Sequence, residues 1–329
     1  MPDLYDVAAI GNAIVDVIAP CDDAFLSENG LTKGAMMLVD PKASAALYSK
    51  MASAVEASGG SAANTIAGLA SFGGQGAFMG KVADDQLGRV FAHDMRAIGA
   101  RFENQPLLGG PATAVSMINV TPDAQRTMCT FLGASVEFSD DDVDPATVEA
   151  AKIVYLEGYL FDAEAARRAF AKAAALAHGA GRKIALTLSD SFVVERHRGG
   201  LLGFIETQVD LLFANEAELL ALFETSDFAE ATEQLLRRCE LAAVTRSEKG
   251  SVILSKGQQL HIPAEPVEKV VDTTGAGDQY AAGFMFGLSQ GRSLADCGRL
   301  ASLAAAEVIS HYGPRPQVSL KDLAASKGL

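Results

Sequence analysis

Short apolar runs alternate with amphipathic helical segments along most of this chain. The runs expected to be strands are 7–10, 77–80, 153–156, 184–187, 211–214 and 242–245. The segments expected to be helices are 63–72, 162–178, 216–223, 229–238, 277–289 and 293–310. Strands that alternate with helices form a mostly parallel sheet covered by helices on both faces. The sequence therefore predicts an α/β fold.

Two early stretches, 13–40 and 113–132, break this alternation because they contain short strands and turn residues, such as Thr121-Pro-Asp-Ala124. We expect them to pair as a small β-sheet that forms a lid over the edge of the main sheet where ligands bind. The core would then comprise residues 1–12, 41–112 and 133–329. Ordinary edge hairpins are the alternative.

The surface charge argues against nucleic acid and anionic membranes as partners. The chain carries 41 acidic and 27 basic residues, a net charge of −14, and this field repels polyanions. No uncharged apolar run approaches the ~18 residues that span a bilayer, and the N-terminus lacks the pattern of a signal peptide. The four scattered cysteines fit reduced thiols. We expect a cytoplasmic monomer or homodimer that binds a small molecule.

The clearest motif is Asp272-Thr-Thr-Gly-Ala-Gly-Asp278, a glycine-rich turn that runs directly into a helix. The backbone N–H groups of Gly275, Ala276 and Gly277 and the helix N-terminus form a cradle for phosphate charge. Asp278 lies in the first helical turn, where its carboxylate can take the proton of an attacking hydroxyl. A simple N-cap aspartate is the alternative.

The complete string resembles the signature of the ribokinase-like (PfkB) family of sugar and nucleoside kinases, where DTxGAGD ends in the catalytic base. Gly59-Gly60-Ser61-Ala-Ala-Asn64 agrees, because the family carries there a Gly-Gly turn and an asparagine that touch the substrate sugar. The resemblance extends from Gly11 to beyond Glu307. It implies a nine-stranded sheet with a β lid and a kinase that uses ATP and Mg²⁺. A monovalent cation such as K⁺ is compatible with it.

The resemblance also assigns the substrate side of the site. Asp16, in Gly11-Asn12-Ala-Ile-Val-Asp16, stands where the family's aspartate binds two sugar hydroxyls, and two charged acceptor bonds suit a cis-diol. For Asp16, a turn residue between strand and lid is the alternative. The substrate contacts implied or expected are Asn12, Asp16, Gly60, Ser61 and Asn64, with Met36, Leu38, Phe131 and Tyr159 as apolar or aromatic surface for a flat base. Plain lid core is the alternative for the apolar residues.

Asn215-Glu-Ala-Glu218 resembles the family's NxxE element, in which Asn215 and Glu218 hold magnesium largely through water molecules. A capping motif at the start of a surface helix is the alternative.

The nucleotide loop of the family resembles Val244-Thr-Arg-Ser-Glu-Lys-Gly250. Thr245 and Gly250 would lie against the ATP phosphates and Arg246 would add charge, although Ser247 stands where many members have glycine. Thr274, Gly275 and Gly277 are expected to contact the phosphates as well. Arg126, at the tip of the lid, is expected to move over them when the lid closes, and an exposed turn arginine is the alternative.

Adenosine is the acceptor that we expect. Gly60-Ser61 lacks the lysine that follows Gly-Gly in ribokinases, and the Gly11-Asn12…Asp16 opening resembles adenosine kinases. A free sugar such as fructose or ribose, or another nucleoside, is the alternative. A dinucleotide-binding oxidoreductase would need GxGxxG directly after the first strand, which this chain does not supply. A non-catalytic nucleotide sensor on the same fold would be expected to lack Asp278.

Overall fold

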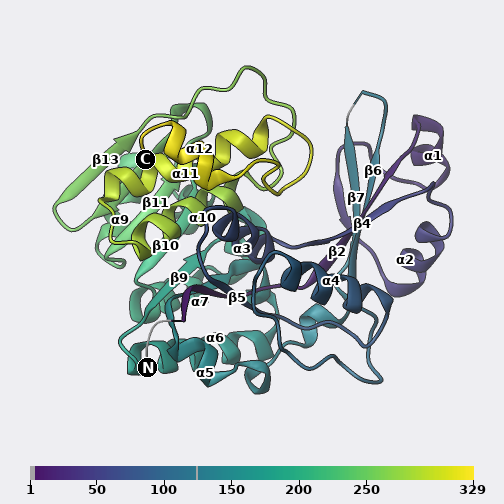
Figure 1. Cartoon of the computed structure of the whole chain (residues 1–329), viewed down its shortest axis with the longest axis horizontal. Helices are drawn as coiled ribbons and strands as arrows, with labels where there is room; N and C mark the ends of the chain where they lie inside the picture. The colour runs from purple at the N-terminus through teal and green to yellow at the C-terminus, as the bar shows by residue number, and fades with distance from the viewer. Residues whose placement is uncertain (1–3, 124) are drawn as a thin grey trace.

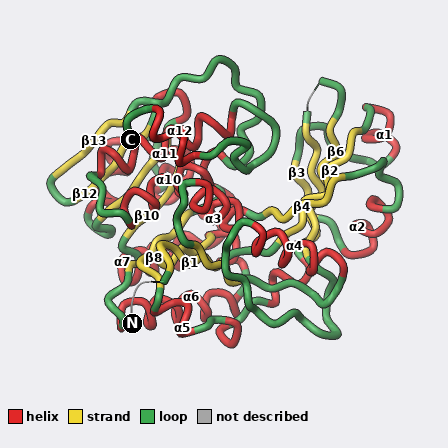
Figure 2. The backbone as a smooth tube through the Cα atoms, in the orientation of Figure 1, coloured by secondary structure: helices red, strands yellow, loops and turns green. Residues whose placement is uncertain are grey.

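In the computed structural model, which describes residues 4–123 and 125–329, the strands form a large and a small sheet that lie apart (Figures 1 and 2). The large sheet contains β1 (Tyr5–Ile10), β5 (Gly76–Met79), β8 (Ala151–Glu157), β9 (Lys183–Thr187), β10 (Leu211–Asn215), β11 (Leu241–Thr245), β12 (Ser251–Ser255) and β13 (Gln258–Ile262). Its order is β13-β12-β11-β10-β9-β8-β1-β5. The small sheet contains β2 (Ile14–Pro20), β3 (Met36–Leu38), β4 (Val55–Gly59), β6 (Ala114–Val120) and β7 (Arg126–Phe131), in the order β3-β7-β6-β2-β4.

Most helices cover the two faces of the large sheet, but the first two lie beside the small sheet (Figure 1). The described residues contain twelve α-helices. They are α1 (Asp23–Glu28), α2 (Pro41–Tyr48), α3 (Ser61–Ser71), α4 (Gln86–Ala97), α5 (Pro145–Glu149), α6 (Glu164–Gly179), α7 (Ser191–Gln208), α8 (Glu216–Phe223), α9 (Phe228–Leu236), α10 (Ala276–Ser289), α11 (Leu294–Ile309) and α12 (Leu320–Ser326). Alternate residues of β1 enter different cores: Ala8 packs with apolar residues of α5 to α9, and Ala9 with those of α3, α4, α10 and α11. Strands buried on both faces are apolar throughout, which explains the runs in the sequence.

The predicted α/β class with a small separate sheet is confirmed, but two details differ. The large sheet has eight strands among the described residues, not nine, and β12 and β13 are antiparallel to their neighbours. Residues 55–59, expected in the core, pair with β2 as strand β4 of the small sheet. The sequence Val-Glu-Ala-Ser-Gly has no apolar run to mark a strand; pairing with β2 stabilises it instead. Residue 124, at the predicted 121–124 turn, lies outside the described residues.

The two faces of the small sheet differ in character. Val15 and Val17 of β2 are buried in an apolar cluster that also contains Leu47 of α2. Asp16 points to the opposite face, because side chains alternate along a strand. The register aligns Asp16 with Ser116 of β6 and Ala57 of β4. This second face therefore carries the polar residues of the site.

Helices α3 and α10 pack closely side by side. A Cβ atom at Gly68 of α3 would lie 2.8 Å from the Cβ of Ala282, too close for a real contact. Gln279 of α10 is fully buried and donates 2.9 Å hydrogen bonds to the backbone oxygens of Asn64 and Pro314. The start of α10 is thus fixed to α3 and to the segment after α11.

Candidate active site

The predicted glycine-rich turn begins helix α10. Gly275 is the N-cap residue, with φ of 80° in the left-handed region that favours glycine. A Cβ atom there would lie 2.6 Å from the backbone of Pro314. A Cβ at Gly277 would meet nothing within 4 Å. Among the described residues no acceptor bonds the N–H groups of Gly277 and Asp278, so the turn presents free backbone donors that suit a phosphate group.

Asp278 receives its hydrogen bonds from helix α3. Its Oδ1 accepts a 2.6 Å bond from the Ser61 hydroxyl, and its Oδ2 accepts a 3.4 Å bond from Asn64 Nδ2. Burial raises the pKa of the Asp278 carboxyl to about 6, although these two donors lower it. A carboxylate with a pKa near 6 is ionised at neutral pH and is basic enough to accept a proton.

Arg126 joins the small sheet to the glycine-rich turn, residues 272–278. Its Nη1 donates a 2.5 Å hydrogen bond to Asp272 Oδ2 and lies 3.4 Å from Thr274 Oγ1. The two ion-paired side chains are only 9% and 7% exposed, so Arg126 is not an exposed turn residue. The other oxygen of Asp272 accepts bonds from the hydroxyl and N–H of Thr274. Burial raises the pKa of Asp272, but these donors and Arg126 bring it below its usual value.

Asp16 faces this turn from the small sheet. A Cβ atom at Gly59 would lie 2.5 Å from the carboxyl carbon of Asp16, so the glycine makes room for the side chain. Burial raises the pKa of Asp16 to about 6; Arg315 and Arg126 lower it, and Asp278 raises it. Asp16 and Asp278 are therefore close enough to repel each other, although Asp16 belongs to the small sheet and Asp278 to a helix that packs on the large sheet.

Asn12, between β1 and β2, lies against Gly60, between β4 and α3. Gly60 has φ of 93°, and a Cβ there would collide with the backbone oxygen of Asn12. Asn12 donates to Glu157 Oε1 from its side chain at 2.8 Å and from its backbone at 3.3 Å, while Glu157 Oε2 accepts from Ala62 N at 2.9 Å. Asn12 Oδ1 is buried and has no partner among the described residues.

The four residues expected to form a surface for a flat base do not all lie together. Leu38 pairs with Thr130 in the register, on the same face as Asp16, and Met36 is two residues away on that face. Phe131 pairs with Val115 on the opposite face and packs against the apolar cluster there. Alternation along β7 thus turns Phe131 away from the site, and that interpretation is wrong.

Tyr159 lies beyond the end of β8, in a 3-10 helix that spans Gly158–Asp162. Burial raises the pKa of its hydroxyl, and the negative charges of Asp190, Glu157, Asp278 and Glu218 raise it further. The role of Tyr159 as a substrate contact stays a prediction.

Asn215 and Glu218 form a capping box at the start of α8. The Asn215 side chain donates to Glu218 Oε1 at 2.7 Å and accepts from Glu218 N at 2.8 Å, and Asn215 N donates to Glu218 Oε2 at 3.0 Å. Glu218 is 6% exposed. Burial raises its pKa to about 7, and the charge of Asp190 contributes. The capping alternative is thus present, yet each carboxylate oxygen keeps a free lone pair for water.

These oxygen donors fit magnesium bound through water, because Mg²⁺ prefers oxygen ligands and retains much of its hydration shell. A divalent cation would also compensate the buried charge of Glu218. No group of three or more His, Cys, Asp or Glu residues in the described part of the chain forms a direct metal cage. Any magnesium here would depend on water and on the phosphates of a nucleotide.

The predicted nucleotide loop connects β11 to β12. Thr245 ends β11 beside Asn215 in the register. Ser247 adopts φ of 52°, so the backbone keeps the left-handed conformation although the residue is not glycine. Gly250 has φ of 80° and packs against the end of β13, since a Cβ would lie 2.7 Å from Ala264 N. This packing requires a glycine at position 250 whether or not a nucleotide binds there.

The guanidinium of Arg246 contacts neighbouring side chains. Its Nε and Nη2 bind both oxygens of Glu216, at 3.1 and 2.7 Å, and the guanidinium lies 3.9 Å from the centre of the Phe228 ring. The role of Arg246 beside the ATP phosphates stays a prediction, and its guanidinium already forms a bidentate ion pair with Glu216.

Sequence reasoning missed two charged residues of the site. Glu157 ends β8, at the carboxyl edge of the sheet, and an acid closing an otherwise apolar run was a signal that could have been read. Arg315 donates from Nε to Asn64 Oδ1 at 3.1 Å. It follows α11 in a segment with no motif, so no local pattern indicated it.

Residues 6–320 match the family model described as pfkB family carbohydrate kinase. The crystal structure of adenosine kinase from Sinorhizobium meliloti is similar, with 54% identity, a TM-score of 0.91, and coverage of 98% of this chain and 99% of that one. That of a probable sugar kinase from Rhizobium etli has 49% identity, a TM-score of 0.92 and 99% coverage of both chains. Saccharomyces cerevisiae adenosine kinase is 25% identical over 334 residues, 94% of this chain and 96% of that protein.

Within the described residues, no helix is long and apolar enough to cross a bilayer.

Proposed function

This chain belongs to the pfkB family of carbohydrate kinases, and from that premise we propose that it transfers the terminal phosphoryl group of ATP to the 5′-hydroxyl of adenosine. The observation that carries the choice of acceptor is the likeness, at 54% identity over nearly the whole of both chains, to the adenosine kinase of Sinorhizobium meliloti. The reaction would produce AMP and ADP in the cytoplasm and would serve purine salvage.

Asp278 is the proposed base. Its carboxylate is ionised at neutral pH, and the donors Ser61 and Asn64 hold it in one orientation. It would accept the proton of the attacking hydroxyl as the bond to phosphorus forms. The free N–H groups of Gly277 and Asp278 would bind the oxygens of the transferred phosphoryl group. Magnesium, bound with ATP and through water at Asn215 and Glu218, would supply additional charge neutralisation.

Asp16 is proposed to bind the ribose. A carboxylate on the face of the small sheet, opposite the glycine-rich turn, can accept hydrogen bonds from the 2′- and 3′-hydroxyls while the 5′-hydroxyl approaches Asp278. Leu38 and Met36 lie on the same face and are 64% and 52% exposed. Such apolar side chains would pack against the adenine ring and lose their exposure.

The small sheet is proposed to act as a lid. Arg126 at the start of β7 contacts Asp272 and Thr274 of the glycine-rich turn, so motion of the small sheet would change the positive charge near the phosphates. Closure of the lid would exclude water, which competes with the hydroxyl as phosphoryl acceptor.

A sugar acceptor is the second candidate. The probable sugar kinase of Rhizobium etli is nearly as similar as the adenosine kinase, and Asp16 would bind the diol of a sugar equally well. The two candidates differ in the apolar part of the ligand. A free sugar would leave Leu38 and Met36 exposed, whereas adenosine would cover them.

The test compares adenosine with 2′-deoxyadenosine in wild type and in Asp16→Ala. Removal of the 2′-hydroxyl leaves a buried carboxylate short of a partner, which costs roughly 1.5–3 kcal/mol, or about ten- to a hundredfold in kcat/KM. Wild type should discriminate by this factor, and the variant should lose most of the discrimination while it becomes slower on both.

Two outcomes contradict parts of this proposal. An unchanged ratio in Asp16→Ala would mean that recognition of the ribose does not depend on Asp16. Wild-type phosphorylation of fructose or ribose, with no activity on adenosine, would exclude the nucleoside and leave a sugar kinase.

A further inference from the structure

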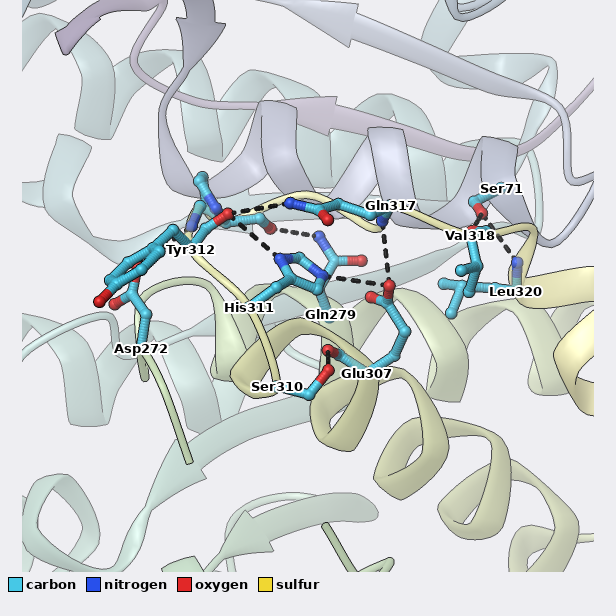
Figure 3. A network of polar contacts seen from close by, with 12 residues as sticks. Ser71, Asp272, Gln279, Glu307, Ser310, His311, Tyr312, Gln317, Val318 and Leu320 are labelled. Atoms are coloured by element: carbon cyan, nitrogen blue, oxygen red, sulfur yellow. Dashed lines mark hydrogen bonds and ion pairs between the residues drawn. The ribbon is translucent and has the colours of Figure 1, made fainter. Parts of the chain in front are cut away.

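Arg315 lies in a well-fixed segment between α11 and α12. Gly313 N donates to Asp272 Oδ2 at 3.1 Å, and Pro314 O accepts from Gln279. Figure 3 shows the rest of this network: Glu307 Oε1 accepts from Gln317 N and lies 3.1 Å from His311 Nε2. The backbone before and after Arg315 is thus attached to the glycine-rich turn and to α11, so its side chain has a defined origin.

The guanidinium of Arg315 is directed into the active site. Besides its bond to Asn64 Oδ1, it is close enough to Asp16, Asp94 and Asp278 for their charges to act on it. Its Nη2 is buried and has no hydrogen-bond partner among the described residues. Arg246 provides a contrast within the same chain, because there Nε and Nη2 are both used on one carboxylate.

This arrangement does not favour stability. A buried N–H without an acceptor costs free energy, and taking a guanidinium out of water carries a desolvation penalty. The contacts instead concern the base: Arg315 holds Asn64 Oδ1, and the other end of the same carboxamide, Nδ2, faces Asp278 Oδ2. The orientation of the carboxamide is therefore fixed by Arg315.

We propose that Arg315 is a positioning residue for the reaction: it orients Asn64 toward Asp278 and keeps the Asp278 carboxylate ionised while a second carboxylate, Asp16, and the phosphates of the nucleotide crowd the site. This inference rests on the proposed role of Asp278 as the base. It does not depend on whether the acceptor is adenosine or a sugar.

The ionisable groups around Asp278 come from several elements. The charge of Asp278 acts on Asp16 of β2, on Tyr155 and Glu157 of β8, and on Tyr159 after β8. Arg315 and the neutral donors Ser61 and Asn64 of α3 act on Asp278 itself. Arg315 is the positive charge that lowers the pKa of Asp278. Its removal should raise that pKa, so the acid limb of the pH–rate profile should move to higher pH.

The experiment measures kcat/KM against pH for wild type, Arg315→Met and Arg315→Lys, with whichever acceptor wild type phosphorylates. Arg315→Met should shift the acid limb upward by about one pH unit or more, as expected for loss of a nearby opposite charge. Arg315→Lys keeps the charge and loses the planar fork, so its acid limb should stay near that of wild type while kcat falls. Arg299→Met, an arginine of α11 paired with Asp296, removes the same charge elsewhere and should change neither.

A second readout does not require turnover. The carboxyl carbon of Asp278, assigned with Asp278→Asn, can be titrated by NMR in aspartate-labelled protein, and its pKa should be higher in Arg315→Met. An equal pKa in wild type and Arg315→Met, for a variant with wild-type melting temperature, would overturn the proposal. If wild type phosphorylates no acceptor while the NMR shift is present, the proposed function fails and the charge effect of Arg315 stands.

Discussion

Helices α8 and α10 both have an acidic residue at their third position, but the two side chains make different hydrogen bonds. In α8 the N-cap is Asn215 and the third residue is Glu218; in α10 the N-cap is Gly275 and the third residue is Asp278. Glu218 binds back to its own cap residue through both carboxylate oxygens. Asp278 has no cap side chain to bind and accepts its hydrogen bonds from α3.

The difference follows from the cap residue. Asparagine offers a side chain that completes a reciprocal capping box and holds the acid against its own helix. Glycine offers none, and its left-handed backbone leaves the first turn open. Burial raises the pKa of both acids, but the Asp278 carboxylate is not bound back to its own helix cap. A helix start can therefore be made stable or reactive by the residue three positions before the acid.

The largest effect that would test this contrast is on turnover. Asp278→Asn should keep the fold and lower kcat by on the order of 10²–10⁴, the contribution of a general base. Glu218→Gln, the matched change at the other helix, should lower kcat far less. Steady-state assays of both purified variants compare the two. If Asp278→Asn retained more than about a tenth of the wild-type kcat, Asp278 would not be the base.

The next effect is on the cap residues themselves. Gly275→Ala should lower the free energy of unfolding by roughly 1–3 kcal/mol, because alanine strains the left-handed backbone and collides with Pro314. Asn215→Gly should cost only a few tenths of a kcal/mol. Urea unfolding of the two variants gives both values. Equal losses at the two caps would remove the distinction between them.

The smallest effects concern Glu218 and its charge. Glu218→Gln should raise the magnesium concentration needed for half-maximal rate, since a carboxylate orders the hydrated cation better than an amide. An unchanged magnesium titration would mean that Glu218 acts only as a helix-capping residue.

The same variant also tests how Glu218 affects stability as a function of pH. The folded-state pKa of Glu218, about 7, is above its usual value of 4.5, so its contribution to stability is complete below about pH 4.5 and is lost as the pH rises through 7. Without magnesium, the melting temperature of wild type relative to Glu218→Gln should therefore fall between pH 5 and pH 8. A constant difference would mean that Glu218 does not titrate in this range.

The features that the sequence could predict are those with a local signal. The glycine-rich turn before Asp278 and the apolar runs of the parallel strands depend on neighbouring residues, and the structure contains both. Strand β4 has no such signal, because its pairing with β2 is what makes it a strand. The bond between Arg315 and Asn64 joins residues 251 positions apart, and no local pattern could indicate it.

One error shows the limit of residue type as a guide. Phe131 was expected at the site for its aromatic ring, yet the alternation of β7 turns it to the opposite face from Asp16. Its residue type was compatible with the role, but the direction of its side chain, which its neighbours in space determine, was not.

The close packing of Gly68 against Ala282 limits which mutations this enzyme can accumulate during evolution. Gly68 is four residues beyond Asn64 and touches no substrate in the proposed reaction. It sets the spacing between the helix that carries the proposed base and the helix that carries the hydrogen-bond donors of that base. A heritable change to any larger residue would push the two helices apart and leave every active-site side chain unchanged in identity. Loss of activity could thus arise in a lineage whose active-site sequence is intact.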